Sequence, residues 1–358
     1  MFWLSGFVHV KLKSDIEHSC FKMRGQAVII VNEKAVGGSK FKERKGASKD
    51  DDNLQRAFCT KLKFKWLNHG QDRDLKKSEW IHSAEKAPPN CGCITCKIQN
   101  TNHENSECFL LVMSSHGSEV GGEQYIRFSD GEEVKLSEII KALSDEKCRS
   151  LEGKPRILIL QACRSNPVLP EDQREDPGYN VDIGIQNINL DDTETNSADG
   201  NDAQPKTGNE LGQGDQLENT NNTTADARQE GTDVSSSVEE SDADPEEVNT
   251  GSPQCFIPKN FLIVYPSAAG KRAKRDTSKG SWLIDELCNA IDEHNFKKDT
   301  EMNFLKILTE AAGSVARSRE THDGYKNAPS IVHRLIEPLI FKDVADESEN
   351  MPTDRPAL

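Results

Sequence analysis

The stretch Pro155-Arg156-Ile157-Leu158-Ile159-Leu160-Gln161-Ala162-Cys163-Arg164 decides the fold of this chain. Four consecutive aliphatic residues between a proline-led start and a small or polar end are typical of a strand buried on both faces, as in a parallel sheet. Cys163 stands where this strand ends. Ligands bind beyond the carboxyl ends of strands in open α/β sheets, which favours a chemical role for the thiol. The alternative is a buried, inert cysteine.

Other segments of the chain have the patterns of buried strands or amphipathic helices. The predicted strands cover residues 26–32, 63–67, 108–114, 156–162, 261–265 and 330–341, the last interrupted by Pro338. The predicted helices cover residues 50–62, 74–86, 136–143, 280–294 and 303–319. Alternating strands and helices imply right-handed crossovers. The sequence therefore predicts a three-layer α/β domain, with a mostly parallel six-stranded sheet and helices on both faces.

The acidity of the chain belongs to one segment. Of the formal net charge of -15, residues 166–254 contribute 22 Asp and Glu against 3 Lys and Arg, which leaves the remainder slightly basic. This segment is too poor in apolar residues to offset its ordering entropy, so we expect a disordered insertion between two strands of one sheet. A near-neutral globular part gives no support for nucleic-acid binding.

Cysteine usage and hydropathy indicate the compartment. The chain has 10 cysteines, irregularly spaced, which favours reduced thiols in a cytoplasmic protein. The apolar start, Met1 to Val10, lacks a basic run ahead of it and a cleavage pattern behind it, which argues against a signal peptide. No apolar stretch approaches the length of a membrane span, so we expect no membrane partner.

His116 and Cys163 each follow the carboxyl end of a predicted buried strand. The two strands are joined by a single helical crossover, so we expect them to be neighbours about 5 Å apart, with both side chains at one edge of the sheet. A nearby imidazole lets a cysteine act as a nucleophile and then supplies a proton to the leaving group. The alternative for His116 is a loop histidine with no role.

Gln161-Ala162-Cys163-Arg164, with His116 lying 47 residues upstream in Ser115-His116-Gly117, resembles the signature of the caspase family. Further segments match in the same order: Arg24-Gly25-Gln26-Ala27, Gly153-Lys154-Pro155, Lys279-Gly280-Ser281-Trp282 and the final strand. The resemblance covers residues 24–165 and 255–341, which in the family become large and small subunits. It leaves a short N-terminal segment (1–23), the acidic linker (166–254) and a tail (342–358).

The resemblance implies a role for each site residue. Cys163 is the nucleophile, His116 donates a proton to the departing amine, and the backbone N–H groups of Gly117 and Cys163 form the oxyanion hole. Arg44, Gln161 and Arg275 hold the carboxylate of a substrate aspartate, because guanidinium groups bind carboxylates bidentately. Without the motif, each arginine taken alone is better explained as a solvated surface charge. No third catalytic residue is evident.

Three positions depart from the family pattern. Ser165 replaces the glycine that usually ends the signature, which puts the backbone beyond the nucleophile in question. Arg272 and Lys274 stand where the family usually places aromatic residues that line the next subsites. Two cations there favour an acidic substrate residue over a small apolar one.

The resemblance implies an effector-type, aspartate-specific cysteine endopeptidase of programmed cell death that needs no cofactor and acts on protein substrates. It implies a zymogen cleaved in the linker, by itself or by an upstream caspase, with Asp199, Asp226 and Asp242 as candidate sites. Ile331–Phe341 is expected to pair with its copy in a homodimer. The alternatives are a catalytically silent homologue that regulates active caspases, and a protease that cuts after basic residues.

A separate cysteine cluster has the thiolate density of a zinc site. It consists of Cys91, Cys93 and Cys96, with His103 and Cys108 nearby. Structural zinc sites usually pair two separated ligand couples, and here Cys108 opens an apolar strand. The interpretation favoured by the sequence is an exposed loop between a helix and a strand, with no metal.

Overall fold

The computed structural model describes residues 23–82, 88–176 and 256–343. Its main sheet contains β1 (Met23–Val31), β2 (Lys65–Trp66), β3 (Ser106–Ser114), β7 (Arg156–Gln161), β8 (Phe261–Tyr265) and β12 (Ser330–His333). The helices are α1 (Ser48–Leu54), α2 (Lys77–Trp80), α3 (Ile94–Asn100), α4 (Leu136–Ala142), α5 (Glu171–Arg174), α7 (Trp282–Glu293) and α8 (Phe304–Ser318). A π-helix over Gln55–Lys61 continues α1, and a short 3-10 turn covers Arg149–Leu151.

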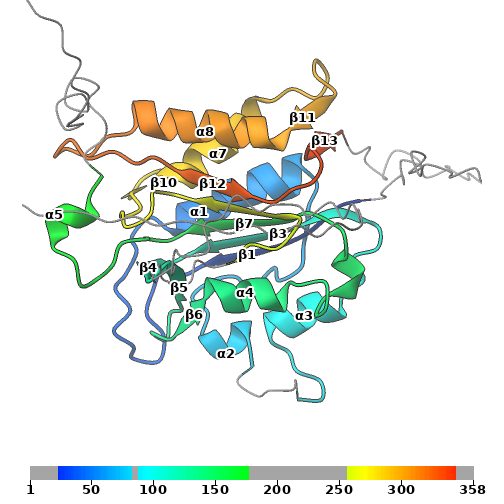
Figure 1. The fold of residues 1–358 in the computed structure, drawn as a ribbon, viewed down its shortest axis with the longest axis horizontal. Helices are drawn as coiled ribbons and strands as arrows, with labels where there is room; N and C mark the ends of the chain where they lie inside the picture. Colours follow the sequence, from blue (N-terminus) through cyan, green and yellow to red (C-terminus); the bar gives the residue numbers. More distant parts are fainter. Residues whose placement is uncertain (1–22, 83–87, 177–255, 344–358) are drawn as a thin grey trace, which may run out of the picture. The chain divides into compact units, whose positions relative to one another are not determined.

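Six strands form the sheet in the order β12-β8-β7-β3-β1-β2 (Figure 1). Every neighbouring pair is parallel except β12 with β8, which is antiparallel. The central pair, β3 and β7, stays in register from Phe109 opposite Arg156 to Ser114 opposite Gln161. The predicted mostly parallel six-stranded α/β sheet is confirmed.

Helices cover both faces of this sheet, with α1, α7 and α8 on one side and α2, α3 and α4 on the other (Figure 1). Successive residues of a strand point to opposite faces. Accordingly, Ile157 and Ile159 join a core with the helices of the first side, whereas Leu158 and Leu160 join a second core with those of the other. This two-sided burial explains why the β7 sequence is continuously apolar.

Short strands outside the main sheet were not predicted. A three-stranded antiparallel sheet follows β3 and contains β4 (His116–Val120), β5 (Glu123–Arg127) and β6 (Glu133–Lys135). Two antiparallel pairs lie in the later part of the chain: β9 (Arg275–Asp276) with β10 (Gly280–Ser281), and β11 (Glu301–Asn303) with β13 (Ile340–Lys342). Strands this short carry no periodic signal in the sequence.

The helix predicted over residues 74–86 was wrong in extent, since α2 covers only Lys77–Trp80. Asp74 has a left-handed backbone with a φ of 51°. Its carboxylate accepts hydrogen bonds from the backbone N–H groups of Glu33 and Lys34, each at 2.6 Å. These bonds hold Asp74 in a loop, against a segment distant in sequence. The helix therefore begins only at Lys77.

The final strand predicted over residues 330–341, with an interruption at Pro338, is two separate strands in the structure. β12 ends at His333, and after a turn the chain forms β13, which pairs with β11 instead of the main sheet. Pro338 has no N–H to donate and cannot continue a ladder. The sheet edge predicted to extend over Ile331–Phe341 is therefore limited to β12.

The predicted exposed loop holds only part of the cysteine cluster: Cys91 lies in a loop and is partly exposed, whereas Cys93 and Cys96 are buried at the start of α3. Cys93 is the N-cap residue of α3, and Cys96 lies within this helix. The buried residues of α3 include Ile94 and Ile98. The prediction failed because a seven-residue helix is too short to show a clear period.

The structure describes only the start of the predicted acidic linker. Residues 166–176 are described; they contain α5, and Glu175 is buried. The rest of the predicted linker, with Asp199, Asp226 and Asp242, lies outside the described residues, as do residues 1–22 and 344–358.

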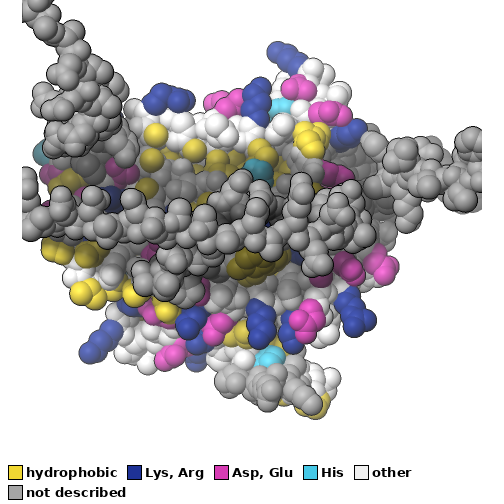
Figure 2. All heavy atoms as spheres, viewed as in Figure 1, with side chains coloured by type: hydrophobic (Ala, Val, Ile, Leu, Met, Phe, Trp, Pro, Cys, Tyr) yellow, Lys and Arg dark blue, Asp and Glu magenta, His cyan; other side chains and the backbone are white. Residues whose placement is uncertain are grey.

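Two further features bear on binding partners. In the part of the chain that the structure describes, no helix combines the length and the hydropathy needed to cross a membrane. On the face drawn in Figure 2, basic and acidic side chains of the described residues are interspersed, not gathered by sign.

Candidate active site

The site is built where β3 and β7 end at the same edge of the sheet. Ser114 pairs with Gln161, and the N–H of Ser115 donates to the carbonyl of Gln161 at 3.0 Å. His116 and Cys163 each stand two residues beyond that last pair. The register of the two strands thus places the imidazole and the thiol at the same edge of the sheet.

Gly117 is required by the close approach of these two strand ends. A β-carbon at this position would lie 2.6 Å from the carbonyl oxygen of Tyr125 and 2.9 Å from the β-carbon of Ala162. Such contacts are too short for any side chain. Glycine therefore lets the backbone beside His116 pack directly against the residue before Cys163.

A backbone carbonyl orients the imidazole of His116. Its Nε2 lies 2.7 Å from the carbonyl oxygen of Lys42, and its ring meets Phe41 edge-on with 4.8 Å between centroids. A carbonyl can only accept a hydrogen bond, so Nε2 carries the proton and Nδ1 presents the lone pair. This third group could not be predicted from the sequence, because any residue can supply a backbone carbonyl.

The surroundings of His116 favour its neutral form. Burial lowers its pKa to about 4, and the charges of Arg44, Arg275 and Arg127 act in the same direction. The hydrogen bond to Lys42 opposes this shift only in part. Near neutral pH the imidazole is therefore uncharged and able to accept a proton.

Cys163 combines a partly exposed side chain with a firmly held backbone. The side-chain amide of Gln124 donates to its carbonyl at 2.9 Å. The next residue, Arg164, donates to Glu119 at 2.6 Å and lies over the ring of Tyr265 at 4.1 Å. The exposure of Cys163 argues against the alternative of an inert core thiol.

Ser165 fits without backbone strain. It is not among the described residues with positive φ, so its conformation is open to any L-residue. Its carbonyl accepts the N–H of Glu119 at 3.4 Å. The replacement of glycine at this position therefore leaves the segment after Cys163 undisturbed.

Arg44 and Arg275 lie close together near the end of β3. Arg44 binds Ser114 at the end of β3, the strand beside β7, and Arg275 binds the backbone of the residue that follows Arg44. Arg44 is only 2% exposed, donating to the carbonyl of Asn32 at 2.6 Å and to Ser114 Oγ at 3.0 Å. Arg275 donates to the carbonyl of Lys45 at 3.0 Å. Neither is a freely solvated surface charge.

The two guanidinium groups favour the binding of an anion. Burial, together with repulsion from Arg275, lowers the pKa of Arg44 to about 10. Burial also lowers the pKa of Arg275. Beside them Gln161 is 2% exposed, and its Oε1 has no hydrogen-bond partner among the described residues. A bound carboxylate would relieve the repulsion and accept hydrogen bonds from the guanidinium groups.

Asp50 supports this pocket, which the sequence did not reveal. Its buried carboxylate accepts the hydroxyl of Ser114 at 2.7 Å, and the hydroxyl and N–H of Ser281 at 2.6 and 2.7 Å. Burial raises its pKa, while these bonds and Arg44 oppose the rise. In sequence, Asp50 is indistinguishable from an acid that suits a helix dipole.

Arg272 and Lys274, the two cations expected to line the next subsites, already form ion pairs within the chain. Arg272 Nη1 lies 2.9 Å from Glu175 Oε1 and 2.7 Å from Glu171 Oε1, and Lys274 pairs with the same Glu175. The side chain of Glu175 is only 8% exposed. The surface expected to prefer acidic substrate residues thus holds an acidic residue of the chain itself.

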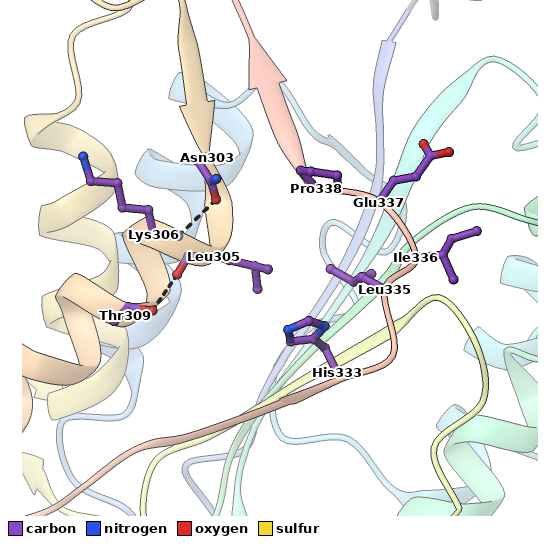
Figure 3. A pocket seen from close by; sticks show the side chains of 9 residues that line it. All are labelled: Asn303, Leu305, Lys306, Thr309, His333, Leu335, Ile336, Glu337 and Pro338. Carbon is purple, nitrogen blue, oxygen red and sulfur yellow. Dashed lines mark hydrogen bonds between the residues drawn. The ribbon is translucent and has the colours of Figure 1, made fainter. Parts of the chain in front are cut away.

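A separate hollow of about 490 Å³ contains none of the candidate catalytic residues (Figure 3). It is lined by the start of α8 and the turn between β12 and β13, and the labelled side chains of His333, Leu335 and Leu305 border it. Among the described residues that line it there is no cysteine.

Comparison with known proteins identifies the family. The profile described as the caspase domain matches residues 24–340. The chain belongs to the caspase family. Family membership makes it a relative of cysteine-type peptidases across nearly its whole described length.

Individual caspases are similar over most of the chain. Caspase-6 of Mus musculus is 25% identical over 327 residues, covering 89% of this chain and 89% of its own. Caspase-7 of Gallus gallus is 23% identical over 329 residues, covering 90% and 78%. The crystal structure of caspase-1 from Spodoptera frugiperda superposes with a TM-score of 0.54 at 21% identity, covering 90% of this chain and 91% of that one. This last similarity supports the fold alone.

We expect His116 to stay neutral down to about pH 4, because burial and the arginine charges disfavour the imidazolium. The unfolded chain binds a proton here below pH 6.5, so this residue lowers folding stability as the pH falls from 6.5 to about 4. NMR titration of histidine-labelled Cys163→Ala protein, with His116→Gln to assign the resonance, measures the pKa. A midpoint near 6.5 would contradict the assignment.

Proposed function

We propose that this caspase-family protein is a cysteine endopeptidase that cleaves peptide bonds after aspartate and acts in programmed cell death. The observation that carries the proposal is the position of two buried or half-buried guanidinium groups. Arg44 donates to Ser114 Oγ at the end of β3, and Arg275 donates to the carbonyl of Lys45, the residue after Arg44. A pocket with two cations beside a nucleophile selects a short acidic side chain at the bond to be cut. The same charges disfavour a substrate with a basic residue there.

The proposed reaction uses Cys163 and His116 in sequence. The thiol proton passes to Nδ1 of His116 as sulfur attacks the substrate carbonyl, and the N–H groups of Gly117 and Cys163 stabilise the oxyanion. The imidazolium then protonates the leaving amine, and an acyl thioester remains. Water adds to the thioester, the substrate carboxylate leaves, and the thiol is restored.

In this mechanism the substrate aspartate also tunes the imidazole. Arg44 and Arg275 are among the charges that lower the pKa of His116. A carboxylate bound between them offsets that repulsion and raises the pKa of His116, which strengthens it as a base. Specificity and proton transfer are thereby linked through the same two guanidinium groups.

Peptides that differ only at the residue before the cut test the function. We expect turnover of the Asp peptide, and replacement of Asp by Asn to lower kcat/KM by about 100-fold or more, because breaking a buried charge pair costs about 3 kcal/mol. Cys163→Ala should abolish turnover, and Arg275→Gln should raise KM for Asp. Cys59→Ser, a partly exposed thiol outside the site, is the control.

No turnover of any peptide would favour the silent regulatory homologue. Preference for Lys or Arg would favour the protease that cuts after basic residues. Either outcome overturns the proposal.

The acidic segment is proposed to be the processing site of a zymogen. Asp199, Asp226 and Asp242 are each followed by a small residue. Active enzyme mixed with full-length Cys163→Ala protein should cut it after one or more of these residues, with fragments mapped by mass spectrometry. Changing all three to Asn should block the cleavage. An intact Cys163→Ala chain would argue against self-processing and leave an upstream caspase as the activator.

The exposed edge of β12 is proposed to pair with its copy in a homodimer. β12 pairs with β8 on one side, and Val332 within it is 42% exposed. An unpaired, partly apolar edge is stabilised by an added strand. In sedimentation experiments on intact and linker-cut protein, Val332→Asp should convert dimer to monomer, whereas Val168→Asp, at a position 86% exposed, should not. A monomeric parent protein in both forms would refute the proposal.

A further inference from the structure

Three thiols gather where the chain enters α3. Cys91 and Cys93 flank Gly92 in the preceding loop, and Cys96 lies in the first turn. Their sulfur atoms all lie within 4.8 Å of one another, and those of Cys91 and Cys93 are 3.3 Å apart. Thiolates bound tetrahedrally to zinc lie about 3.8 Å from one another. The three sulfurs therefore already have nearly the spacing of one face of such a tetrahedron.

The surrounding fold holds this arrangement and leaves one side open. Cys93 and Cys96 are 6% and 3% exposed, whereas Cys91 is partly exposed. The N–H of Cys91 donates to the carbonyl of Pro88 at 3.1 Å, and the N–H of Lys97 donates to that of Cys93 at 3.0 Å. Two ligands are thus fixed by the packing of α3, and the third lies where an ion can enter.

The sulfur of Cys93 lies at the centre of a local hydrogen-bond network. The thiol of Cys91 donates to it at 3.3 Å, and Thr95 Oγ1 lies 3.3 Å from it. The thiol proton of Cys91 thus lies between two sulfur atoms, where a cation can replace it.

We propose that Cys91, Cys93 and Cys96 bind a zinc ion. Sulfur donors select soft or borderline metals over magnesium and calcium, which prefer oxygen. Binding releases the remaining thiol protons to solvent as three Zn–S bonds form. Among the described residues, no fourth His, Cys, Asp or Glu joins the group, so water completes the tetrahedron on the open side.

The neighbouring candidates are used elsewhere. Cys108 lies in β3 with its thiol 3.7 Å from the carbonyl of Arg24, and His103 Nε2 lies 2.9 Å from the carbonyl of Ile98. The proposed site belongs to the helical layer of α2, α3 and α4 (Figure 1). Its role is to fasten the loop before α3 to that helix, and it is independent of the proposed peptidase activity.

Zinc binding is tested on full-length protein carrying Cys163→Ala, which removes the catalytic thiol as a competing ligand and prevents self-cleavage. Under reducing conditions we expect one zinc ion per chain in competition with a chromophoric chelator. Cobalt(II) in place of zinc should give a thiolate charge-transfer band and the visible spectrum of a tetrahedral site. Zinc should also raise the thermal unfolding temperature.

Adding Cys91→Ser, Cys93→Ser or Cys96→Ser should weaken zinc binding by about 100-fold or more and reduce the cobalt charge-transfer band. Cys91→His should retain binding, because imidazole is also a zinc ligand. This rescue distinguishes metal ligation from a purely structural role of the thiol. Cys59→Ser serves as the control and should bind as the parent does.

The proposal is overturned if the parent protein binds no zinc at micromolar concentrations. It is also overturned if the three serine variants bind zinc as tightly as the Cys59→Ser control.

Discussion

The parallel pairing of β3 with β7 is the constraint on which the candidate site depends. Both strands are buried on both faces, so the register cannot slip without moving apolar side chains out of the two cores. The register brings Ser114 opposite Gln161, and the chain continues from these residues to His116 and Cys163. The positions of the imidazole and the thiol are thus consequences of core packing. Ordering of the loops that follow the two strands is not needed to bring the two groups together.

A second constraint is electrostatic. Arg44 and Arg275 come from segments more than 200 residues apart, and burial and mutual repulsion both disfavour their charges. The carboxyl group of Asp50 opposes this effect and favours the charged form of both guanidinium groups. Its carboxylate binds Ser114 and Ser281, which connects the strand end beside the nucleophile to the β9–β10 pair that carries Arg275. The pocket is therefore held together by a buried carboxyl group.

The sequence predicted the main strands and long helices because each buries a face with a clear period. It failed where a contact between distant segments decided the local structure. Asp74 is held by the backbone of Glu33 and Lys34, so a helical pattern does not become a helix there. Residues 340–342 pair with β11, so an apolar final stretch becomes two strands. Glu175 is held by Arg272 and Lys274, and this contact orders a stretch that composition alone assigns to disorder.

By itself the sequence determined the α/β class, the family and the residue types at the candidate site, because these depend on composition, periodicity and a motif written in consecutive residues. Only the tertiary structure decided which groups surround them. The carbonyl of Lys42 on His116, the carboxylate of Asp50 behind Arg44, and the gathering of three thiols at α3 all depend on distances across the fold. Hydrogen bonds and charges act through space, and the order of residues along a chain does not specify those distances.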